Sequence, residues 1–158
     1  APVPPLPVSY PSPNTLLNDE DLGLFVGLQN EGLAHFDGDV WRIYTQAEGL
    51  LDETVTALQV ANDALYIAFS QGAARMDVES ATFTPLPPLA GVSIHSIYHA
   101  RTGTVWFGGP GLFASDPRDD DWPTFTAGAP PTLAWAVRAS AEAADALGFA
   151  TEGGGTVR

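Results

Sequence analysis

The chain has 158 residues, no cysteine and a formal net charge of −13, because 19 acidic residues face six arginines and no lysine. This balance argues against binding to nucleic acid or to an anionic membrane surface, since both require clustered cations. The lack of cysteine excludes disulfides, thiolate nucleophiles and iron–sulfur sites. No apolar run approaches the ~18 residues of a membrane-spanning helix. The start at Ala1-Pro2-Val3, without Met, suggests a processed N-terminus.

Residues 1–15 form a proline-rich segment. Six prolines lie within the first 13 residues, and proline fixes φ and cannot donate a hydrogen bond to a sheet. We therefore expect an extended polyproline II arm. It would serve as a stiff linker or as a strap across a surface, or as a Pro-x-x-Pro ligand for another domain.

The rest of the chain contains an internal repeat. Four similar segments each hold an apolar stretch, a short gap with glycine and a second apolar stretch. Equivalent positions, Phe25, Tyr66, Trp106 and Gly148, are spaced 41, 40 and 42 residues apart. A period kept over three intervals indicates a repeat architecture.

Each repeat unit is expected to form four short strands. In the clearest unit these strands are 55–60, 64–69, 73–76 and 82–84, separated by turns rich in Gly, Asn and Asp. Four antiparallel strands in about 40 residues make the blade of a β-propeller. The sequence therefore predicts an all-β fold, with a partial β-propeller of about 3.5 blades over residues 16–158. The approximate blade units are 22–62, 63–102, 103–144 and a truncated 145–158.

Such a propeller would be incomplete on its own. Rings close with typically 4–8 blades, and neighbouring blades pack on both faces of each sheet. An open stack would leave apolar faces and strand edges exposed. We expect further residues of a longer chain, a second copy or a neighbouring subunit to complete the ring.

Two stretches resemble the two-component-regulator propeller repeat. Residues 101–113, Arg-Thr-Gly-Thr-Val-Trp-Phe-Gly-Gly-Pro-Gly-Leu-Phe, are the closest copy, and residues 42–45 followed by 48–50 resemble the link between repeats in that family. The resemblance covers roughly residues 22–158. It implies an extracytoplasmic ligand-sensing domain, periplasmic, secreted or at the cell surface, with carbohydrate or related ligands.

One segment gives conflicting signals. Residues 133–144 are rich in alanine and follow Pro130-Pro131, which favours a helix. The register of the repeat instead places residues 133–139 in the first strand of a blade, and we favour the register.

The histidines are candidate binding residues. His95 and His99 fall on the same side of one expected strand, ~13 Å apart, which is too far to share a metal ion. His35 aligns with Arg75 and Ala114 of the other units. Because packing does not dictate the residue type there, this position is expected to be exposed or specialised.

Acidic residues give weak signals for metal binding. Asp37, Asp77 and Asp116 recur at one repeat position, so they are expected to shape a turn. The acidic run at residues 116–121 offers carboxylate oxygens to Ca²⁺ but lacks the spacing of an EF-hand loop. These weak metal candidates are Asp116, Asp119, Asp120 and Asp121. No cofactor is expected.

Aromatic residues that the repeats do not share are candidates for stacking on a sugar or anchoring a partner. The full set of candidate binding residues is His35, Trp41, His95, Tyr98, His99, Arg101, Trp122 and Trp135.

The sequence carries none of the common catalytic motifs. We therefore expect a non-catalytic binding module that recognises a partner protein or a glycan outside the cytoplasm. One alternative is a structural accessory subunit of a larger complex. Another is a propeller lyase of the streptogramin-inactivating type, in which His95 or His99 would act as the base.

Overall fold

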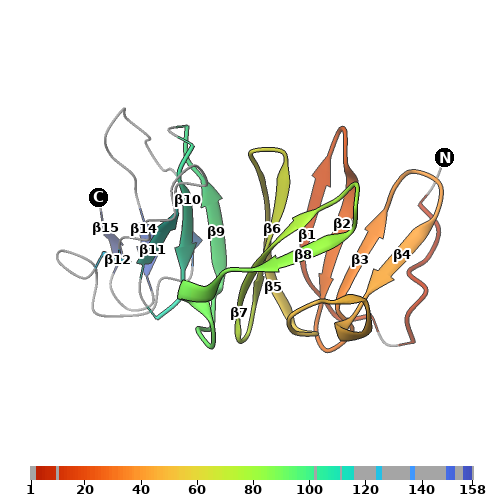
Figure 1. Cartoon of the computed structure of the whole chain (residues 1–158), viewed down its shortest axis with the longest axis horizontal. Helices are drawn as coiled ribbons and strands as arrows, with labels where there is room; N and C mark the ends of the chain where they lie inside the picture. Colours follow the sequence, from red (N-terminus) through yellow and green to blue (C-terminus); the bar gives the residue numbers. More distant parts are fainter. Residues whose placement is uncertain are drawn as a thin grey trace.

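The chain folds into a row of antiparallel sheets (Figure 1). The computed structural model describes residues 3–9, 11–101, 103–110 and 112–115, and beyond them the strand segments 124–125, 136–137, 149–151 and 155–157. Among these residues there is no α-helix, and so no helix of the length and apolarity that crossing a membrane requires.

Within the described residues, three sheets have four strands and the last has three, each in chain order. Sheet 1 contains β1 (Pro13–Asp19), β2 (Gly23–Leu28), β3 (Leu33–Phe36) and β4 (Trp41–Tyr44). Sheet 2 contains β5 (Val55–Ala61), β6 (Ala64–Phe69), β7 (Gly72–Asp77) and β8 (Thr82–Pro85). Sheet 3 contains β9 (Ser96–His99), β10 (Val105–Gly108), β11 (Leu112–Ser115) and β12 (Thr124–Phe125). Sheet 4 contains β13 (Ala136–Val137), β14 (Phe149–Thr151) and β15 (Gly155–Val157).

The predicted all-β class and the four-stranded repeat unit are confirmed. The sheets are nevertheless offset by one strand from the predicted blade units, which start at residues 22, 63 and 103. Each sheet begins one strand earlier, so that β5 and β9 open sheets 2 and 3. The most recognisable residues of the repeat lie in the second and third strands of each sheet. The predicted units therefore begin at the second strand, one strand after the observed start of the sheet. For the same reason the predicted arm, 1–15, overlaps the start of β1 at Pro13.

The alanine-rich segment contains a strand where the repeat register placed one. β13 (Ala136–Val137) pairs antiparallel with β14. Tertiary pairing has therefore overridden helix propensity at these two positions. The rest of 133–144 lies outside the described residues.

The first strands of the sheets lie next to one another, β1 against β5, β5 against β9 and β9 against β13. Side chains join these edges to the next sheet. Asn14 Nδ2 donates to the carbonyl oxygen of Val55 at 3.1 Å, and Thr56 Oγ1 donates to that of Ile94. Backbone groups on a strand edge need such partners when water is excluded.

The core lies between the sheets, because sheet 2 is apolar on both faces. Alternate residues of a strand point to opposite faces, and all six residues of β6 are buried. Leu65, Ile67 and Phe69 pack against sheet 1, whereas Tyr66 and Ala68 pack against sheet 3.

Short capped turns carry the chain from one sheet to the next. A 3₁₀ turn, η1 (Gln46–Glu48), follows β4 and is closed by a capping box, in which Glu48 accepts hydrogen bonds from the backbone and hydroxyl of Thr45 at 2.7 Å. These bonds lower the pKa of Glu48. Leu50 then enters the core between sheets 1 and 2. A second 3₁₀ turn, η2 (Pro87–Leu89), connects β8 to β9.

The proline-rich arm lies along sheet 1 beside β4 (Figure 1). It packs on the face that points away from sheet 2, which we call the outer face of sheet 1. Leu6 and Val8 of the arm contact the cluster formed by Val26, Leu28 and Ala34. Of the three interpretations of the arm, the structure therefore shows a strap across a surface.

A substitution at Gly27 tests the close approach of sheets 1 and 2. A Cβ there would lie 2.5 Å from side-chain carbons of Thr15 on β1 and Val55 on β5. We expect Gly27→Ala to lower the free energy of unfolding by about 1–3 kcal/mol through overpacking, measured by urea denaturation. An unchanged free energy would contradict the packing of β2 against β5.

Candidate functional site

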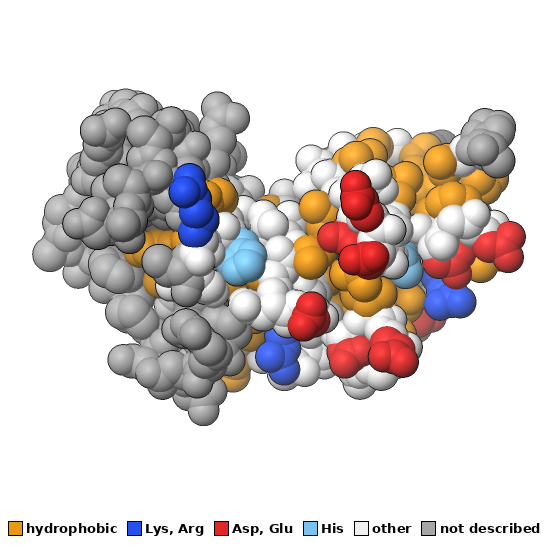
Figure 2. Space-filling view, turned by 90° about the horizontal axis from the view of Figure 1, so that it is seen from above, with side chains coloured by type: hydrophobic (Ala, Val, Ile, Leu, Met, Phe, Trp, Pro, Cys, Tyr) orange, Lys and Arg blue, Asp and Glu red, His pale blue; other side chains and the backbone are white. Residues whose placement is uncertain are grey.

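One end of the sheets carries most of the acidic side chains that the structure describes. Here lie the turns β1–β2, β3–β4, β5–β6, β7–β8 and β9–β10, and we call this end the turn face. Figure 2 looks onto it and shows acidic side chains gathered over the first two sheets. The carboxylates in the turns of sheets 1 and 2 are Asp19, Glu20, Asp21, Asp37, Asp39, Asp63, Asp77 and Glu79.

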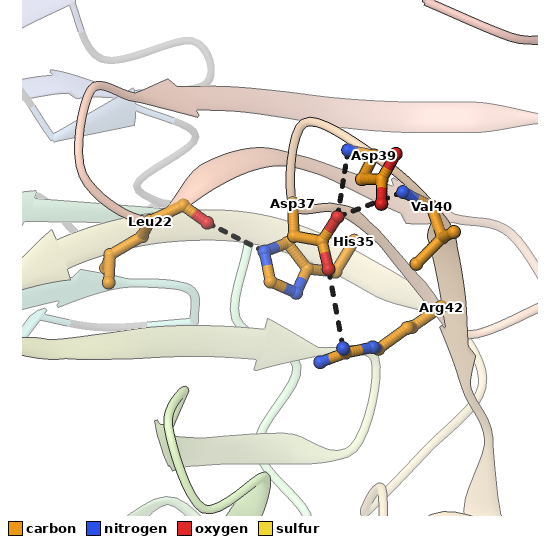
Figure 3. Close-up of polar contacts among 6 residues, drawn as sticks. All are labelled: Leu22, His35, Asp37, Asp39, Val40 and Arg42. Carbon is orange, nitrogen blue, oxygen red and sulfur yellow. Dashed lines mark hydrogen bonds and ion pairs between the residues drawn. The ribbon is translucent and has the colours of Figure 1, made fainter.

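Asp37 shapes the β3–β4 turn (Figure 3). Its Oδ1 accepts hydrogen bonds from the backbone N–H groups of Asp39 and Val40, both at 3.0 Å. Its Oδ2 lies 3.4 Å from Nη2 of Arg42, a partly exposed ion pair. The backbone donors, and to a lesser degree Arg42, hold the pKa of Asp37 below its ordinary value. The carboxylate therefore remains ionised over the neutral pH range.

Asp77 plays the same part in the β7–β8 turn. Its Oδ1 accepts from the backbone N–H of Ser80 at 2.9 Å, and hydrogen bonds from Ser80 lower the pKa of Asp77. The expectation that the recurring aspartates shape turns is therefore confirmed for Asp37 and Asp77. The third, Asp116, lies outside the described residues.

His35 is buried between sheets 1 and 2, with 4% of its surface exposed. Its ring stacks on Phe25, with centroids 4.2 Å apart. Nε2 lies 2.7 Å from the carbonyl oxygen of Leu22 (Figure 3). A carbonyl only accepts, so Nε2 carries the proton in this contact. Nδ1 is buried and has no hydrogen-bond partner among the described residues.

This geometry makes His35 a specialised residue of the first repeat. Its bond to Leu22 ties the β1–β2 turn to β3. At the equivalent place in sheet 2, Arg75 is exposed. The expectation of an exposed position is wrong, and burial keeps His35 from being the exposed binding residue that the sequence suggested.

Trp41 lies on β4, at the outer face of sheet 1. Its indole Nε1 donates to the carbonyl oxygen of Pro4 in the arm at 2.9 Å. The ring also packs against Phe36, with centroids 5.2 Å apart. Non-repeated aromatic residues were expected to anchor a partner or stack on a sugar. In this structure Trp41 contacts the chain's own arm.

The remaining described candidates lie in or beside β9. His95 precedes the strand, and its backbone N–H donates to Gly108 at 2.8 Å. Tyr98 and His99 pair with β10 within the strand, and Arg101 is exposed in the turn that follows. Strand geometry separates His95 from His99 by ~13 Å, so the two histidines lie toward opposite ends of β9.

The structure does not bring the described candidates into one cluster. His99 and Arg101 lie at the turn face, His95 lies at the other end of β9, and His35 and Trp41 belong to sheet 1. In the part of the chain that the structure describes, no group of three His, Asp or Glu side chains could hold a metal ion. The candidates outside the described residues are Trp122, Trp135, Asp116, Asp119, Asp120 and Asp121.

Sequence reasoning missed one cross-strand pair of polar groups, Tyr66 and Arg75. They are directly opposite each other on β6 and β7, and Tyr66 also contacts Phe107 of sheet 3 edge to face. Burial raises the pKa of Tyr66, while the charge of Arg75 opposes that rise. The cross-strand register of the hairpin was the signal that would have paired Tyr66 with Arg75.

The fold is similar to those of extracellular and surface proteins. The extracellular domain of a putative one-component system from B. thetaiotaomicron matches 94% of this chain, with 16% identity and a TM-score of 0.76. The extracellular domain of a putative hybrid two-component system from the same organism matches 90% of this chain, with 18% identity and a TM-score of 0.69. PorZ, a surface component of the type-IX secretion system of Porphyromonas gingivalis, matches 91%, with 16% identity and a TM-score of 0.66.

The matched region is a small part of each of these proteins. The chain spans 21%, 19% and 20% of their respective lengths. At these identities the similarity establishes the fold, and no protein-family model or curated protein matches the sequence.

The pKa of Asp77 leads to a pH-dependent prediction. Because folding lowers this pKa below 3.8, the ionised carboxylate stabilises the fold above that pH, and the contribution is lost as the pH falls through the lower, folded value. We expect Asp77→Ala to lower Tm at pH 7, and the difference from the wild type to shrink below pH 3.8. Thermal unfolding followed by circular dichroism measures both.

Asp39→Ala is the matched control, because it removes a carboxylate from the same face without removing one of the turn hydrogen bonds described above. A difference between wild type and Asp77→Ala that stayed constant down to pH 2 would show that charge plays no part in this turn.

Proposed function

We propose that this chain is part of a non-catalytic β-propeller that binds a partner protein or a glycan outside the cytoplasm. The observation that carries the proposal is the row of four-stranded sheets joined through their first strands. This arrangement is similar to two extracellular domains of putative sensory systems and to a bacterial surface component.

The four sheets would be blades of a larger ring. Support comes from the adjacent first strands, which in a propeller surround the central channel, and from the short span of this chain within the larger proteins that it resembles. Further chain, a second copy or a neighbouring subunit would complete the ring. The similarity to PorZ supports a second version of the proposal, a structural accessory subunit within a surface assembly.

The turn face is the proposed recognition surface. The sheet faces between neighbouring sheets are filled by core side chains, which leaves the ends of the sheets to meet a ligand. Ionised carboxylates such as Asp37 and Asp77 accept hydrogen bonds from sugar hydroxyls or from basic side chains. His99 and Arg101 add a donor and a cation at the same end.

Binding tests would start from the 158-residue chain on a glycan array and on a panel of basic proteins. For any glycan found, we expect His99→Ala/Arg101→Ala to weaken binding at least tenfold, about 1.4 kcal/mol, measured by calorimetry. Gln71→Ala, an exposed residue at the opposite end, is the control. Binding lost in the control and kept in the double variant would contradict the placement of the site.

The lyase alternative has its own test. Chromatography of a cyclic streptogramin incubated with the chain is expected to show no ring-opened product, because the sequence carries none of the common catalytic motifs. A product whose formation is abolished by His95→Ala/His99→Ala would replace the binding proposal with the enzyme.

A further inference from the structure

The outer face of sheet 1 holds the proline-rich arm through side-chain contacts. Leu6 and Val8 are partly buried against Val26, Leu28 and Ala34, which are at most 4% exposed. Alternate arm residues thus supply two apolar anchors. Pro7 separates the two anchors, and the chain bends at residues 7–9.

A hydrogen bond fixes the arm at a second place. The indole N–H of Trp41 donates to the carbonyl oxygen of Pro4 at 2.9 Å. Residues 3–9 belong to no helix or strand, so their carbonyl oxygens are not used in a regular backbone ladder. Aromatic grooves that bind proline-rich peptides exploit their preformed, low-entropy conformation.

The arm does not extend the sheet. Residues 3–9 contain no strand, and three prolines in this stretch lack the N–H that a ladder requires. Recognition therefore rests on two apolar side chains and one carbonyl. A separate peptide can present these three features as well as the tethered arm does.

The lack of charged side chains on this face favours an uncharged ligand. Residues 3–9 carry no charged side chain. The strand residues that share the outer face by alternation are also uncharged, although the whole chain carries −13. They are Leu16, Asn18, Leu24, Val26, Leu28, Ala34, Phe36, Trp41 and Ile43.

We propose that, as long as no neighbouring blade of the proposed ring packs there, the outer face of sheet 1 is a binding site for an uncharged, proline-rich peptide, which residues 3–9 occupy as an intramolecular ligand. The arm then governs access to the site. A short tether gives a millimolar effective concentration, so an intrinsic dissociation constant on the order of 0.1 mM keeps the arm docked. A partner with a similar segment would bind when the arm is displaced.

The test releases the arm and supplies its sequence in trans. Leu6→Asp/Val8→Asp places charges on both anchors of the full chain. A labelled, end-capped peptide of residues 3–9 is then titrated, with binding followed by fluorescence anisotropy. We expect saturable binding to the released variant, at least tenfold tighter than to the wild type, whose own arm competes. The indole N–H resonance of Trp41 should shift on release and return when the peptide binds.

Three controls separate the site from general stickiness. Val3→Asp adds a charge to an arm residue that is 50% exposed, and it should leave the Trp41 resonance unchanged. A peptide carrying the two aspartates should not bind. In the released background, Trp41→Phe should weaken peptide binding several-fold through loss of one hydrogen bond. If Leu6→Asp/Val8→Asp fails to fold, Leu6→Ala/Val8→Ala serves as the released variant.

Two results would overturn the proposal. One is a folded, released variant that does not bind the peptide or whose Trp41 resonance matches the wild type. The other is a released variant that forms a discrete dimer, dissociated by Leu16→Glu on the same face, where Leu16 is 65% exposed. The occupant would then be another sheet and not a peptide.

Discussion

The sheets of this chain pack through their faces, and apolar surface on a sheet face must be removed from water. Sheet 2 shows the constraint most clearly, because Ile67 and Phe69 pack against sheet 1 while Tyr66 and Ala68 pack against sheet 3. Burying side chains of this size contributes about 1.5–3 kcal/mol each. No sheet with two such faces is stable by itself, so the unit of stability is the stack.

The same constraint explains the arm. Sheet 1 presents Val26 and Leu28 on a face that no other described sheet covers. Leu6 and Val8 cover these side chains in place of a neighbouring sheet, and Trp41 holds the arm in position. A proline-rich segment suits this task, since it loses little conformational entropy when it docks and does not pair with the strand edges.

Charge follows from the packing of the faces. With both faces of the sheets apolar, carboxylates lie in the turns, where Asp37 and Asp77 accept backbone hydrogen bonds and keep low pKa values. The ends of the sheets are therefore anionic and rigid. Any recognition at the turn face meets groups that are already oriented by the fold.

The period of the repeat was enough to predict the strands, because hairpins of fixed length place apolar residues at fixed positions. It also predicted the turn aspartates and the strand at Ala136–Val137, against local helix propensity. The period could not predict contacts that occur in only one repeat or that involve residues outside the repeats. The burial of His35 depends on Phe25 and on the carbonyl of Leu22, and the role of Trp41 depends on an arm outside the repeat.

Native-state hydrogen exchange of the intact chain tests the two-faced packing most directly. β6 (Ala64–Phe69) is paired on both edges and buried on both faces. The account predicts that its amides exchange more slowly than those of β2 (Gly23–Leu28), which is also paired on both edges but has only the arm on its outer face. Equal protection in the two strands would contradict it, because the stack would then add nothing to the stability of its central strand.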